Sequence, residues 1–214
     1  MQIDPTLLSI EDRYKLLIGA VVPRPIAFVS TCSPSDPSVT NLAPFSFFAG
    51  VGSNPMTLLF CPANTPDGRE KDTLRNCKPV SEGGQGELVI NIVPHALAQR
   101  MAACAEPLPY GESEFDLAHL TRAASVKVKP PRVAESPISF ECRTLSVIRT
   151  NPGQPAGGNV VLAEVLYIHA AEGLVSDRRH VDPSLLDAIG RMGGGSYCTT
   201  RDRFDMPMGR KALG

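Results

Sequence analysis

Two long alternating segments in the second half of the chain constrain its fold more than any other feature. Residues 137–150, "PISFECRTLSVIRT", and residues 158–172, "GNVVLAEVLYIHAAE", exchange apolar and polar side chains with the period of a half-buried strand. The turn-rich stretch "NPGQPAGG" separates them. A short turn can join antiparallel neighbours, whereas parallel strands need a long crossover. The pattern therefore predicts a long antiparallel hairpin.

Shorter apolar segments supply further strands. Residues 23–33, 56–63 and 86–93 read as strands because proline, glycine or serine-rich stretches bound them. Turns join these segments more often than crossover helices do. We therefore expect a mostly β protein, an antiparallel barrel with a few peripheral helices, and not a doubly wound parallel sheet.

Three segments carry helix signals. In residues 9–20, Ser9 can cap a first helix and Asp12 stands at the reciprocal position of a capping box. Residues 94–106 have apolar side chains at helical spacing. Residues 182–195 begin with Asp-Pro and end in glycines, which predicts a short helix that the glycines terminate.

Length and composition indicate one ordinary globular unit. The segment 106–137 is polar and rich in proline, and we interpret it as an excursion over the barrel, so that residues 1–214 form a single domain. The net charge of −1 offers no basic field for nucleic acid or an anionic membrane surface. No apolar run is long enough to span a bilayer, and the first residues lack the pattern of a signal peptide. A cytoplasmic location is the expectation.

Familiar catalytic and metal-binding motifs are absent from the sequence. It contains no GxGxxG after a strand, no P-loop, no HExxH and no GxSxG, so we name no catalytic residue and no metal ligand. No cysteine pair has CxxC spacing, and reduced thiols are expected in a chain without an export signal. The six cysteines are Cys32, Cys61, Cys77, Cys104, Cys142 and Cys198.

One cluster of motifs between residues 23 and 76 suggests a binding site. "PRPIAFVST", "NLAPFSF" and "FCPAN" are followed by "GREKDTLRN", where Asp72 reads as a helix N-cap flanked by Lys71 and Thr73. A helix start with a lysine and a hydroxyl suits a phosphate. Taken alone, "KDTLRN" is more often a solvated capped helix and "APFSFF" a core strand. Together they offer a phosphate site beside an apolar slot, which fits flavin mononucleotide (FMN).

These motifs, with "SEF", "PRV", "ESP" with "FEC", and "GRMGGGSY", resemble the signature of the flavin reductase-like, FMN-binding split-barrel family. The resemblance runs from about Tyr14 to Met208 and implies an antiparallel split β-barrel. It also implies a homodimer with the flavin close to the subunit interface. Arg191 or Tyr197 would then either reach the partner's flavin or serve as a surface arginine and a packed tyrosine. The glycine-rich stretch 80–87 is longer than the family pattern and is expected to extend a loop over the pocket.

The resemblance implies a cofactor-binding role for twelve residues. The ring edge should meet Ala43, Ser46 and Phe47, with Asn41 near the ribityl chain. Cys61, Pro62 and Ala63 should lie beside the phosphate tail, and Lys71, Asp72 and Thr73 should close the phosphate site. Arg24 and Thr31 are further candidates.

Three functions follow from this interpretation. The first is an oxidoreductase, an NAD(P)H:flavin reductase that moves a hydride from NADH or NADPH to FMN and passes electrons to an oxygenase or another acceptor. The second is a flavoredoxin-like electron carrier that holds FMN but does not oxidise NAD(P)H directly. The third is a barrel that binds no cofactor. The sequence separates neither the first two functions nor NADH from NADPH.

Overall fold

The computed structural model describes residues 1–213 and confirms a mostly antiparallel β fold. Its strands are β1 (Arg24–Pro25), β2 (Ala27–Cys32), β3 (Thr40–Phe45), β4 (Phe48–Ser53), β5 (Met56–Phe60), β6 (Glu87–Ile92), β7 (Arg122–Ala123), β8 (Arg132–Val133), β9 (Ile138–Arg149), β10 (Asn159–Ala170), β11 (Ile189–Arg191) and β12 (Tyr197–Thr199). The α-helices are α1 (Ile10–Ala20), α2 (Asp72–Cys77), α3 (Ala98–Ala103), α4 (Glu114–Leu117) and α5 (Pro183–Leu186). Short 3₁₀ turns span Pro5–Leu7, Val80–Glu82, His95–Leu97 and Gly209–Leu213.

The predicted hairpin is the longest pairing in the molecule. β9 and β10 pair antiparallel from Asn159 opposite Arg149 to Ala170 opposite Ile138, with two register shifts along the way. The turn between them is closed by Thr150, whose backbone N–H donates to the Gly158 carbonyl at 2.9 Å. The hairpin forms the middle of a seven-stranded sheet with the order β3-β2-β6-β9-β10-β5-β4.

The two strands at the ends of this order, β3 and β4, are consecutive in the chain and are joined by only Ser46 and Phe47. In a flat sheet of seven strands the two edges would lie about 29 Å apart. Three peptide steps span at most about 11 Å. The sheet therefore has to curl until its edges meet, and this closure turns it into a barrel.

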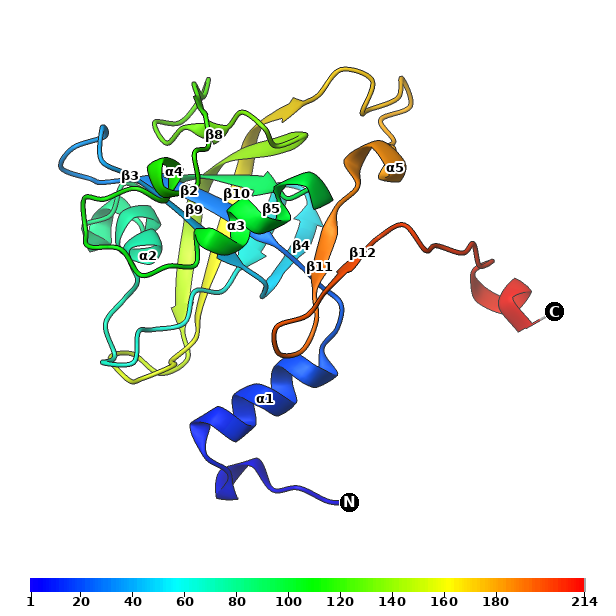
Figure 1. Cartoon of the computed structure of the whole chain (residues 1–214), viewed down its shortest axis with the longest axis horizontal. Helices are drawn as coiled ribbons and strands as arrows, with labels where there is room; N and C mark the ends of the chain where they lie inside the picture. Colours follow the sequence, from blue (N-terminus) through cyan, green and yellow to red (C-terminus); the bar gives the residue numbers. More distant parts are fainter. Residues whose placement is uncertain (214) are drawn as a thin grey trace.

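Both faces of β2 are covered, so all six of its residues are buried. Ala27 and Val29 lie in one apolar cluster, which includes Leu74 of α2. Phe28 lies in a second cluster with Phe115 of α4, and this cluster also holds Met101 of α3. α2 thus packs on one face of β2, and α3 and α4 pack on the other; Figure 1 shows α2 at one end of the barrel and α3 and α4 in front of it.

The first helix is confirmed with its predicted cap. The Asp12 backbone N–H donates to the Ser9 hydroxyl at 3.0 Å, and that hydroxyl lies 2.7 Å from the Asp12 carboxylate. α1 nevertheless projects from the body, and the segment after β12 runs away from it (Figure 1). Only Ile18 of α1 is buried.

The prediction for residues 182–195 is wrong in its extent. Asp182 caps α5 through the N–H groups of Ser184 and Leu185. The helix then ends after Leu186, because Asp187 adopts a left-handed conformation with φ of 42°. The glycines do not terminate the helix, since the strand β11 and the turn before β12 occupy that stretch. Among residues 1–213 no helix has the length and apolar character to cross a membrane.

Candidate functional site

A cavity of about 890 Å³ lies between β3, α2 and the segment 104–110. Its volume falls in the usual range for small-molecule and cofactor sites. The residues that line it are Asn41, Ala43, Pro44, Phe45, Thr65, Arg69, Glu70, Lys71, Asp72, Thr73, Arg75, Lys78, Cys104, Ala105, Glu106, Pro107, Leu108, Pro109, Tyr110 and Glu114.

One wall of the cavity comes from β3. Asn41, Ala43 and Phe45 alternate along the strand and therefore face the same side. The Asn41 side-chain amide donates to the Thr73 hydroxyl at 2.9 Å, which ties this wall to α2. The wall is apolar at Ala43 and Phe45 and polar at Asn41, where it meets α2.

The opposite wall begins with the loop into α2. Lys71 is the N-cap of this helix and Asp72 its first helical residue, so the prediction that Asp72 is the N-cap is wrong by one position. The Asp72 carboxylate instead pairs with Arg75 at 2.8 Å. Lys71 has no carboxylate within 4.0 Å among residues 1–213, and its ammonium lies 5.9 Å from the centre of the Phe45 ring. Lys71 is exposed to solvent at the mouth of the cavity, and partial desolvation by the surrounding protein lowers its pKa. This lysine is thus a cation in the cavity that lacks a neutralising partner.

Glu114 of α4 closes the cavity beside β3. Its carboxylate accepts a hydrogen bond of 2.8 Å from the Leu42 backbone N–H, and burial raises the pKa of this carboxyl. The bond holds α4 against the edge strand, which fixes the position of Asn41 and Ala43 on either side of Leu42.

Five of the twelve predicted cofactor residues line this cavity together: Asn41, Ala43, Lys71, Asp72 and Thr73. Ser46 and Phe47 lie in the link between β3 and β4, next to Arg24. Arg24 is 3% exposed, and all of its hydrogen bonds go to groups of the protein.

Ser46, Phe47 and Arg24 lie outside the lining of this cavity, and so do the other four predicted residues, which make structural contacts. The Thr31 hydroxyl accepts from the Asn76 side-chain amide at 3.1 Å. The Cys61 backbone N–H donates to the Phe47 carbonyl at 2.9 Å, and the Pro62 carbonyl accepts from Asn159 at 2.9 Å. Ala63 forms an isolated bridge with Gly158. All six cysteines are free thiols, and burial raises the pKa of Cys61.

The sequence interpretation missed the segment 104–110 and the basic residues Arg69, Arg75 and Lys78. The spacing of Lys71, Arg75 and Lys78, four and then three residues apart, is a signal that places them on one side of a short helix. Segment 104–110 carries no such period. Its place over α2 depends on the tertiary fold, so the sequence pattern does not reveal it. In the described part of the chain, no three His, Cys, Asp or Glu side chains gather in a way that could hold a metal ion.

Comparison with known sequences gives matches over most of the chain. The model of the family described as "Flavin reductase like domain" matches residues 19–193. An uncharacterised protein from Deinococcus radiodurans is 39% identical over 211 residues, which cover 95% of this chain and 87% of that protein. An uncharacterised protein from Halalkalibacterium halodurans is 35% identical and covers 96% of this chain and 95% of its own length.

Solved structures give the same result for the fold. Nitrilotriacetate monooxygenase component B from Bacillus cereus superposes with a TM-score of 0.87 at 31% identity, covering 96% of this chain and 98% of that one. The 2-nitrobenzoate 2-nitroreductase from Pseudomonas fluorescens has a TM-score of 0.83 at 26% identity and covers 98% and 97%. A Shewanella frigidimarina protein with a split barrel domain has a TM-score of 0.80 at 18% identity, with coverage of 98% and 100%. The closed sheet is therefore a split β-barrel, as predicted.

Proposed function

The chain belongs to the flavin reductase-like family, and on that premise we propose that it is an oxidoreductase that binds FMN and accepts a hydride from NADH or NADPH. The observation that carries the proposal is the cavity itself. It offers an apolar strand wall at one side and, at the other, Lys71 without a carboxylate partner among residues 1–213. An apolar ring with an anionic tail suits that distribution.

The residues in the cavity fit FMN part by part. Ala43, Pro44 and Phe45 provide apolar surface for a flat ring. The amide of Asn41 and the hydroxyl of Thr73, which lie 2.9 Å apart, can exchange hydrogen bonds with the hydroxyls of a ribityl chain. Lys71 supplies a charge for the phosphate. Ser46 and Phe47 at the ring edge, and Cys61, Pro62 and Ala63 beside the phosphate tail, remain part of the proposal, with Arg24 and Thr31 as further candidates.

A bound flavin would supply the redox chemistry, and the chain would supply binding and orientation. Glu114 holds β3 in place through the Leu42 N–H, so that Asn41 and Ala43 present a fixed surface. We assign no catalytic acid or base, because hydride transfer does not require one. The nicotinamide donor would use the open part of the same cavity, since the sequence contains no Rossmann motif.

We propose a homodimer as the working form, located in the cytoplasm. α1 leaves large apolar side chains such as Tyr14 and Leu17 about half exposed, and the C-terminal segment exposes Phe204 and Met206. Exposed apolar surface of this kind is typical of a protein–protein contact, which supports a dimer. The β11–β12 turn packs closely against α1. A Cβ added at Gly193 would lie only 3.3 Å from the Gly19 Cα.

The electron acceptor is proposed from a relative. The protein from Bacillus cereus is a monooxygenase component and is 31% identical to this chain. An oxygenase that consumes reduced flavin is therefore the first acceptor to test. We propose no nucleic acid or membrane partner.

Two measurements test the proposal. An absorption spectrum of the purified protein, followed by an FMN titration, should show saturable binding. Stopped-flow mixing of the FMN complex with NADH or NADPH under nitrogen should bleach the flavin absorbance. No bleaching with either donor rejects the reductase. Tight flavin retention without bleaching would favour the electron carrier, and no binding at all would favour the cofactor-free barrel.

A further inference from the structure

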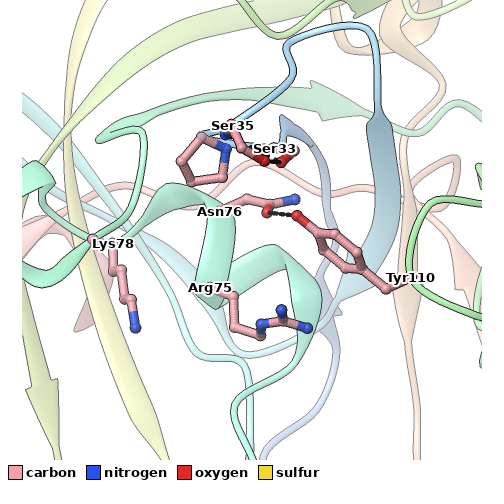
Figure 2. A pocket seen from close by; sticks show the side chains of 8 residues that line it. Ser33, Ser35, Arg75, Asn76, Lys78 and Tyr110 are labelled. Carbon is pink, nitrogen blue, oxygen red and sulfur yellow. Dashed lines mark hydrogen bonds between the residues drawn. The ribbon is translucent and has the colours of Figure 1, made fainter.

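A second hollow, of about 280 Å³, lies beside the candidate flavin cavity and has no role in the proposal above. Figure 2 shows its lining side chains. Arg75, Lys78 and Tyr110 line both spaces, so the hollow and the cavity meet at these three residues. The hollow is smaller than a typical site for a whole cofactor, which suits one part of a larger ligand.

The floor of the hollow consists of polar groups in fixed positions. Ser33 and Asn76 are each 2% exposed. The Asn76 amide donates to Thr31 at 3.1 Å and accepts from the Tyr110 hydroxyl at 3.4 Å. The hydroxyls of Ser33 and Ser35 lie 3.0 Å apart. Figure 2 shows this contact and the one between Tyr110 and Asn76. Hydroxyl and amide groups of this kind hydrogen-bond the oxygens of sugars and phosphates.

A row of cations leads from the cavity to the hollow. Lys71, Arg75 and Lys78 are spaced as neighbours on successive turns, and only the last two line the hollow. Arg75 pairs with Asp72 at 2.8 Å and Lys78 with Glu70 at 2.9 Å. Both carboxylates line the larger cavity, whereas the lining of the hollow contains no carboxylate. Arg75 uses one terminal nitrogen in its pair, and its remaining N–H groups have no partner among residues 1–213. A guanidinium with free donors is suited to a phosphate.

Tyr110 adds a stacking surface at the junction. The guanidinium carbon of Arg75 lies 4.5 Å from the centre of the Tyr110 ring, and the Tyr110 side chain is partly exposed. Purine bases stack on aromatic rings and on guanidinium planes. The hollow thus joins hydroxyls, a cationic rim and a stacking group within one small space.

The geometry points to a subsite for the phosphorylated adenosine half of a dinucleotide, and this inference rests on the proposed function because it requires the first phosphate at Lys71. FMN ends at that phosphate and does not extend into the hollow. FAD continues with a second phosphate and an adenosine, and the row of cations follows the same direction. NADH and NADPH contain the same phosphorylated adenosine, so the experiment has to separate the two sources.

Ser35 offers a clean test because it lines only the hollow and is exposed on the loop between β2 and β3. Ser35→Glu places a negative charge in the hollow, Ser35→Gln is its neutral control of matched size, and Ser35→Lys reverses the charge. Isothermal titration calorimetry would give the Kd of FMN and FAD for each variant. We expect wild type to bind FAD more tightly than FMN. We expect Ser35→Glu to weaken FAD binding about tenfold relative to Ser35→Gln, since like charges repel at this range. Ser35→Lys should not weaken FAD binding, and the Kd of FMN should stay within about twofold throughout.

A second arm measures the KM of NADH and NADPH with each FMN-saturated variant. A higher KM for Ser35→Glu with an unchanged Kd of FAD assigns the subsite to the nicotinamide dinucleotide. Equal FAD affinity and equal KM for Ser35→Glu and Ser35→Gln overturn the inference. Failure of wild type to bind FMN in the first titration instead overturns the proposed function. An unchanged melting temperature of Ser35→Gln verifies that the loop tolerates substitution.

Discussion

Replacement of Arg24 by methionine tests whether a buried cation holds α1 to the barrel. Arg24 donates to the Ile18 and Val21 carbonyls at 2.6 and 2.8 Å, to the Met192 carbonyl at 3.0 Å and to the Ser46 hydroxyl at 3.3 Å. The first two carbonyls lie at the C-terminal end of α1, where helix carbonyls lack intrahelical partners and carry partial negative charge. No carboxylate lies within 4.0 Å of Arg24 in residues 1–213, so these dipoles take the place of a counter-ion.

The expected loss of stability follows from the carbonyl groups that lose their hydrogen-bond donor in Arg24→Met. Hydrogen bonds to a charged group contribute about 1.5–3 kcal/mol each, and bonds that share one group are not additive. The variant leaves two or three carbonyls without a donor, each at a cost of about 1–3 kcal/mol, so loss of the whole set should cost about 3–5 kcal/mol. For a chain of this length each kcal/mol shifts Tm by about 2–4 °C, so Tm should fall by about 10 °C. Arg24→Lys keeps the charge but not the planar fork, and should recover only part of the loss.

Differential scanning calorimetry at one fixed protein concentration is the assay, because dimer formation would make Tm depend on concentration. Arg143→Met is the control. Arg143, unlike Arg24, makes an ion pair, with Glu164 at 2.7 Å, but its side chain is exposed, and such pairs contribute at most about 1 kcal/mol. A Tm for Arg24→Met within about 2 °C of the Arg143→Met value would refute the role assigned to Arg24.

Three further predictions concern the cavity, the acid stability and the long hairpin. Lys71→Met should raise the Kd of FMN about tenfold and leave that of riboflavin, which lacks the phosphate, unchanged in parallel titrations; equal effects on both ligands would contradict the role of Lys71. Glu141 is fully buried, and burial alone would raise the pKa of its carboxyl. The hydrogen bonds from His169 and from the N–H groups of Val126 and Lys127 outweigh burial, so the pKa of Glu141 lies below the ordinary value of 4.5. Its stabilisation is therefore complete above about pH 4.5 and is lost as pH falls through the folded pKa, so Glu141→Gln should flatten the acid limb of a plot of unfolding free energy against pH; an unchanged limb would speak against this pairing. Gly157→Ala should destabilise the protein by more than about 1 kcal/mol in urea unfolding, because the new Cβ would lie 2.2 Å from the Asn151 carbonyl oxygen, whereas Gly195→Ala meets no atom within 4 Å and should be neutral.

The parts of the fold that local patterns determine could be predicted from the sequence. The β9–β10 hairpin follows from alternation over 12 residues in each strand, and the start of α1 follows from the Ser9 and Asp12 pair. The end of α5 could not be predicted in this way, because an aspartate at position 187, not a glycine, takes the left-handed conformation.

The candidate site likewise has residues that local patterns predict and residues that only the tertiary fold brings in. Asn41, Ala43, Lys71 and Thr73 stand in contiguous motifs, and the structure brings them to one cavity. Tyr110 and Glu114 reach the cavity from a segment without a regular period, through contacts such as the bond from Leu42 N–H to Glu114, 72 residues along the chain. The donors of Arg24 find their acceptor Met192 at a distance of 168 residues, which no local pattern can reveal.

The two-residue link between β3 and β4 limits the circumference of the barrel by covalent bonds as well as by hydrogen bonds. Ser46 and Phe47 set how far apart the two rims can stand, whatever the hydrogen-bond ladders elsewhere allow. The strand that carries Asn41 and Ala43 cannot swing outward without pulling β4 and its partner β5 along. A ligand in the cavity therefore rests against a strand whose distance from β4 is fixed by the chain itself, and not against a hinged flap.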